Sequence, residues 1–132
     1  MKKVRIAVVL GWVGFVCTFG LGIELFALPE LAATYFNMAF TAGGFNSFII
    51  RMIAIGLLPI GLAYLLAAID QDASRSLLMV ATFGKILSVL GELAAIFSGT
   101  ATSYIYGGVI MDGIFALVGI YAVMTMGKQK AG

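Results

Sequence analysis

Four stretches of about 22 residues with very little charge set the strongest limit on what this chain can fold into. A helix of about 20 apolar residues crosses the hydrocarbon core of a bilayer, which is about 30 Å thick. Polar or turn-rich segments separate the stretches and predict three loops. The predicted membrane spans are 6–27, 48–69, 76–97 and 105–126. The sequence therefore predicts an all-α integral membrane protein with one transmembrane domain, residues 1–132, folded as a compact antiparallel four-helix bundle.

Composition supports this class and excludes others. Of the 132 residues, 62% are hydrophobic and 11% are charged, whereas soluble domains hold about 25% charged residues. The chain has no histidine and one cysteine, Cys17, so neither an intramolecular disulfide nor a zinc site of the usual kind can form. We expect no metal and no cofactor. The basic residues form no patch beyond the termini, so we expect no nucleic-acid partner.

The distribution of basic residues predicts how the bundle is oriented. Outside the spans they occur only in the terminal segments and the second loop, at Lys2, Lys3, Arg5, Arg75, Lys128 and Lys130. The positive-inside rule then places both termini in the cytoplasm of a multi-pass inner-membrane protein. The opening MKKVRIAVVLGWVGFVC also resembles a secretory signal. We interpret it as the first span, because the Gly-Phe-Val before Cys17 lacks the small residue that lipoprotein processing needs.

The first loop, LPELAATYFNMAFTAGGFNS, has helical periodicity of its own. Pro29 is a favourable first residue of a helix, and the apolar residues that follow it recur at helical spacing. This pattern predicts a short interfacial helix, either a simple connector or a lid over the space beneath it.

Small residues and one proline indicate how the spans pack. Gly11, Gly14, Thr18 and Gly22 share one face of the first span, and such stripes mark helix contacts in membranes. Pro59 removes a backbone donor near the middle of the second span, so we expect a kink there.

Five charged residues lie inside the predicted spans. Counted at 1.5 Å per residue, Glu24, Arg51, Glu92 and Asp112 fall in the outer half of the bilayer and Lys85 near its middle. Unpaired charges facing lipid are disfavoured. We therefore predict a ligand-binding or buried charge network, with Ser88 on the same helix face as Lys85 and Glu92. Its members are Glu24, Arg51, Lys85, Ser88, Glu92 and Asp112.

Three functions fit such a network. The first is an outward-facing pocket that binds a lipid-like or quinone-like amphiphile, with Lys85 or Arg51 at the polar head. The second is an accessory or structural subunit of a larger membrane complex or homo-oligomer, in which the charges fix helix register. The third is proton-coupled transport of a small molecule. No motif specifies a reaction, so we predict no catalytic residue and favour a non-enzymatic protein.

Three segments carry a family resemblance. LFALPELAATYFN, RMIAIGLLPIGLAYLLAAID and VIMDGIFALVGIYAV resemble the DoxX-like group of small four-helix bacterial membrane proteins, and especially its DUF4345-type branch. The matching positions are Pro29, Arg51 with Gly56, Asp70, and Asp112 in the fourth span. The resemblance implies a four-helix fold in a bacterial inner membrane and no particular biochemical role.

Overall fold

The computed structural model describes residues 2–127, which contain six α-helices and one π-helix. The first span consists of α1 (Lys2–Gly14), the π-helix η1 (Phe15–Phe19) and α2 (Gly20–Ala27), which follow one another without a break. The remaining helices are α3 (Pro29–Tyr35), α4 (Phe45–Ile69), α5 (Ser74–Phe97) and α6 (Ser103–Gly127).

The predicted all-α fold of four long antiparallel helices is confirmed. The segments long and apolar enough to cross a membrane are Ile6–Ala27, Phe45–Ile69, Ser74–Phe97 and Ser103–Met126. Their last residues are those predicted from the sequence. The short helix expected in the first loop is α3, which begins at Pro29 as predicted. Leu28, the residue before it, has φ −123° and ψ 57°, so the chain leaves the helical conformation between α2 and α3.

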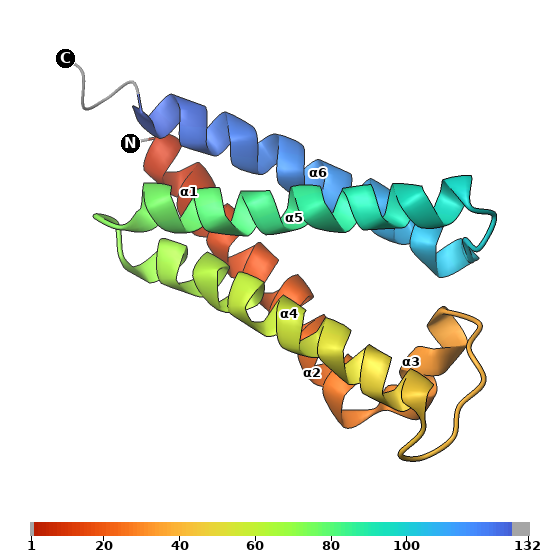
Figure 1. Cartoon of the computed structure of the whole chain (residues 1–132). Helices are drawn as coiled ribbons and strands as arrows, with labels where there is room; N and C mark the ends of the chain where they lie inside the picture. The colour runs from red at the N-terminus through yellow and green to blue at the C-terminus, as the bar shows by residue number, and fades with distance from the viewer. Residues whose placement is uncertain (1, 128–132) are drawn as a thin grey trace.

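The long helices form two pairs that diverge (Figure 1). The first span packs along α4, and α5 packs along α6. At the end marked by the Asp70 turn, where the Asp70 carboxylate accepts hydrogen bonds from two backbone amides, α1 contacts both α5 and α6. Within the described residues, neither η1 nor α2 comes into backbone contact with α5 or α6. The bundle is therefore compact at the Asp70 end and divided at the opposite end, which carries α3.

Two separate hydrophobic clusters follow from this shape. The larger one, at the Asp70 end, is centred on the fully buried Tyr64 and Leu78 and draws on α1, α4, α5 and α6. The smaller one, at the α3 end, is centred on Leu25 and Ile50 and draws on α2, α3, α4 and the loop that follows α3. No apolar cluster of the described residues joins the two helix pairs at the α3 end, and the charged residues lie in that region.

Glycine allows the first span to approach α4 closely. A Cβ atom at Gly11 would lie 2.6 Å from the Tyr64 carbonyl oxygen, and one at Gly61 would lie 2.6 Å from the Phe19 backbone nitrogen. Both distances are too short for real contacts, so only glycine fits. The small-residue stripe predicted for the first span is confirmed as a helix contact, and its partner is α4.

Gly61→Ala tests this contact. We expect the variant to lose about 1–3 kcal/mol of unfolding free energy, because the added methyl meets backbone atoms that cannot move aside. The matched control is Gly56→Ala on the same helix, where a Cβ atom would meet nothing within 4 Å. Titration of the detergent-solubilised protein with a denaturing detergent, followed by circular dichroism, gives both values. Equal stability of the two variants would contradict the close packing.

Pro59 does not interrupt the second span. The helix α4 continues from Phe45 to Ile69 with Pro59 inside it, and Pro59 lies on the exposed side of the helix. The kink expected at this position stays a prediction.

Candidate functional site

A buried ion pair links the two long helices α5 and α6. The Nζ atom of Lys85 lies 2.7 Å from Oδ1 of Asp112, and the two side chains are 5% and 15% exposed. The same ammonium lies 5.3 Å from the centre of the Phe115 ring, at cation–π distance. The charge of Lys85 is therefore already compensated within the protein.

Glu92 lies two helical turns beyond Lys85 on the same face of α5. Its carboxylate rests against α6 at Gly108, where a Cβ atom would collide with it. Its Oε2 atom is buried and has no hydrogen-bond partner among the described residues. Such an acceptor in an apolar environment lacks the compensation that buried polar groups normally have.

Glu24 is held by the loop helix α3. The hydroxyl of Tyr35 donates a hydrogen bond of 2.5 Å to Oε1 of Glu24, and this bond raises the pKa of Tyr35 above the ordinary tyrosine value. The ring of Tyr35 stacks on Tyr104 of α6 at 4.8 Å, and the hydroxyl of Thr102 donates to the Tyr35 carbonyl oxygen at 2.7 Å. Tyr35 thus bridges the two helix pairs at the α3 end.

Two of the predicted residues lie outside this group. The Ser88 hydroxyl donates to the carbonyl oxygen of Gly84 on its own helix at 3.2 Å, so it takes no part in the ion pair. Arg51 was expected in the buried network, but it is exposed on α4 and lines none of the pockets described below. It lies in the second turn of α4, close enough to the helix end for its long side chain to reach the interface.

The charged residues line a pocket of about 620 Å³ between the first span and the α5–α6 pair, hereafter the charged pocket. Four charged residues of the network predicted from the sequence line this pocket: Glu24, Lys85, Glu92 and Asp112. A second pocket of about 380 Å³, on the side of α4, reaches Ser88, Glu92 and Asp112. The carboxylates of Glu92 and Asp112 therefore border both spaces.

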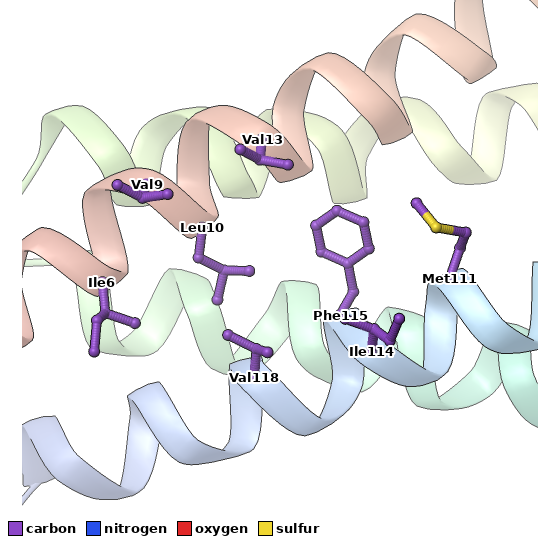
Figure 2. Close-up of a pocket in the computed structure, with 8 residues that line it drawn as sticks. All are labelled: Ile6, Val9, Leu10, Val13, Met111, Ile114, Phe115 and Val118. Atoms are coloured by element: carbon purple, nitrogen blue, oxygen red, sulfur yellow. The ribbon is translucent and has the colours of Figure 1, made fainter.

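An apolar groove continues the charged pocket toward the Asp70 end. It has a volume of about 460 Å³ and no polar lining surface, and it lies between α1 and α6. Figure 2 shows Ile6 and Leu10 of α1 pointing toward α6, where Val118 lies opposite them; Val9 and Val13 of α1 also line the groove. Met111 and Phe115 line both the groove and the charged pocket, so the two spaces are adjacent.

The π-helix η1 borders the charged pocket. Val16 and Cys17 of η1, with Gly20 directly after it, contribute to the lining, and Cys17 is exposed. The π-helix is rare, appears mostly as a single turn within an α-helix, and is frequent at functional sites. No pattern in the sequence predicted η1, Tyr35 or Tyr104 as parts of the site. The best available signal was the periodicity of the α3 segment, which placed Tyr35 on the packed face of that helix.

The site is not arranged for metal binding. No group of three or more Asp, Glu, His or Cys residues in the described part of the chain could hold a metal ion, and Lys85 sits among the carboxylates. Comparison of the chain with protein-family models, curated proteins and solved structures gave no match. The resemblance to the DoxX-like group thus stays a prediction from the residues.

Proposed function

We propose that this chain is a non-enzymatic integral membrane protein that binds a single-chain amphiphile. The hydrocarbon tail lies in the apolar groove between α1 and α6, and the polar head lies in the charged pocket. The observation that carries the proposal is the continuity of the two spaces through Met111 and Phe115. A long apolar space that ends at a cluster of charged groups matches the shape and polarity of an amphiphile.

The dimensions and walls of the site support this proposal. Both volumes, about 460 and 620 Å³, fall within the range of about 300–1,000 Å³ typical of small-molecule sites. The groove is open toward the surrounding bilayer along the gap between α1 and α6, so a tail can enter sideways from the lipid. A head group in the charged pocket can replace the hydration that carboxylates lose in a hydrocarbon environment.

The proposed location is a bacterial inner membrane, with both termini in the cytoplasm. This orientation places the α3 end, and with it the charged pocket, toward the outer leaflet. The positive-inside distribution of Lys and Arg supports it, and the resemblance of the Pro29, Arg51 and Asp112 segments to DoxX-like proteins points to the same compartment.

Photolabelling tests the groove directly. The protein in lipid nanodiscs is irradiated with dodecanol that carries a diazirine on its alkyl chain, and cross-linked residues are mapped by mass spectrometry. We expect cross-links on the groove-facing residues of α1 and α6. Val9→Trp, which places an indole in the groove, should reduce labelling about tenfold, a loss equivalent to about 1.4 kcal/mol of binding free energy.

Val80→Trp on α5 is the matched control. Val9 and Val80 are each 60% exposed, but Val80 lines none of the pockets described above. Labelling of this variant should equal that of the native chain. Cross-links spread evenly over the exposed faces of α4 and α5 would refute the proposal and favour a role as an accessory subunit.

A further inference from the structure

The charged pocket has an uneven balance of charge. Its lining contains three carboxylates and one ammonium, which leaves a formal charge of −2 when all four groups are ionised. The Lys85–Asp112 ion pair is neutral as a unit. The excess negative charge therefore belongs to Glu24 and Glu92.

No described cation other than Lys85 is available to these two carboxylates. Glu24 accepts a hydrogen bond from the Tyr35 hydroxyl, which is a neutral donor. Glu92 accepts no hydrogen bond from any described residue, although one of its oxygens is buried. Arg51 is exposed on α4 and does not line the charged pocket, and Arg75 lies at the Asp70 end, where it donates to a backbone carbonyl of α6.

The walls of the pocket increase the effect of this imbalance. Val16 and Met111 are apolar, and electrostatic interactions with the carboxylates are stronger beside apolar walls than in water. The rings of Tyr104 and Phe115 also line the space, and aromatic faces attract cations. An anionic head would meet two uncompensated negative charges here, whereas a cationic head would neutralise one of them.

We infer that the amphiphile bound in this site carries a primary ammonium head group, which donates charge-assisted hydrogen bonds to Glu92. This inference rests on the proposed function and specifies the chemistry of its ligand. The sequence predicted that Lys85 or Arg51 contacts the head group of the amphiphile, and the inference replaces them with Glu92. Lys85 is paired with Asp112, and Arg51 does not line the pocket.

Competition with the same photoprobe tests the head-group chemistry. Unlabelled dodecylammonium, dodecanol and dodecanoate share one tail, and each is titrated against the diazirine probe at neutral pH. We expect dodecylammonium to displace the probe at a concentration at least tenfold below dodecanol, because only the ammonium head donates charge-assisted hydrogen bonds to the carboxylate of Glu92. Dodecanoate should be the weakest competitor.

Glu92→Gln identifies the group responsible. This near-isosteric change should lower the affinity for dodecylammonium at least tenfold and leave the affinity for dodecanol unchanged. Unchanged dodecanol binding would show that the groove of the variant is still folded. Glu30→Gln, at an exposed position on α3 outside the charged pocket, is the control and should change neither.

The remaining outcomes distinguish failure of the ammonium assignment from failure of the proposed binding function. Groove labelling with equal competition by all three head groups, or with dodecanoate strongest, overturns the ammonium assignment and leaves tail binding intact. If Glu92→Gln has no effect on dodecylammonium affinity, the assignment of Glu92 as the partner of the head group is overturned. Absence of groove labelling overturns the proposed function itself and the ammonium assignment with it.

Discussion

Lys85→Met is expected to lower the unfolding free energy by about 3–5 kcal/mol, the usual cost of removing one partner from a buried ion pair. The loss is large because Asp112 is only 15% exposed and would share its site with Glu92 without any cation. Denaturant titration of the detergent-solubilised protein measures the change. Arg51→Met removes a charge from an exposed site and should stay within about 0.5 kcal/mol of the native chain.

Substitution of Asp112, the other member of the ion pair, should lower the unfolding free energy less than Lys85→Met does. In Asp112→Leu, the Lys85 ammonium keeps a carboxylate within reach, because Glu92 borders the same pocket. The double variant Lys85→Met/Asp112→Leu replaces the pair by apolar groups, which is often neutral or stabilising by about 1–4 kcal/mol. If Lys85→Met is as mild as Arg51→Met, the ion pair is not a buried structural element.

Tyr35→Ala is expected to increase the labelling rate of Cys17 by a membrane-impermeant maleimide at least tenfold. The variant loses the hydrogen bond from the Tyr35 hydroxyl to the Glu24 carboxylate and the stack of the Tyr35 ring on Tyr104. Without them α3 no longer connects Glu24 with Tyr104, and water gains access to the charged pocket. Cys17 reports on this because it lines the pocket and is the single cysteine of the chain.

One further variant separates the effect of the Tyr35 hydrogen bond from that of its ring stack, and another serves as a control. Tyr35→Phe keeps the ring stack but not the hydrogen bond, so its labelling rate should fall between those of the native chain and Tyr35→Ala. Thr34→Ala, whose hydroxyl bonds only to Leu31 within α3, should label at the native rate. Unchanged labelling in Tyr35→Ala would mean that α3 is a passive connector and not a cover over the pocket.

The long helices were predictable because membrane spans are specified by local composition and length. The sequence gives the end of each helix to within a few residues, since a run of apolar residues must stop where polar groups return to water. Pro29 also specifies the start of α3 through its own backbone geometry. The division of the bundle at the α3 end was not predictable, because it depends on how two helix pairs lean against each other.

The site was predictable only in part, for a geometric reason. Counting residues gave the depths of Lys85, Glu92 and Asp112, and the structure places these three around one pocket. Depth does not specify the direction in which a side chain points, so Arg51 was expected inside although it is exposed. The bridge made by Tyr35 joins residues far apart in the chain, and no local pattern reveals such a contact.

The two hydrophobic clusters imply that the molecule does not open as a single cooperative unit. Secondary elements that share few apolar contacts separate at lower free energy than the whole fold, and only α4 and the first span belong to both clusters. We therefore expect the Asp70 end, which holds the larger cluster, to stay closed when the two helix pairs separate at the α3 end. Hydrogen exchange should therefore be slower for the backbone amides around the larger cluster than for those at the α3 end.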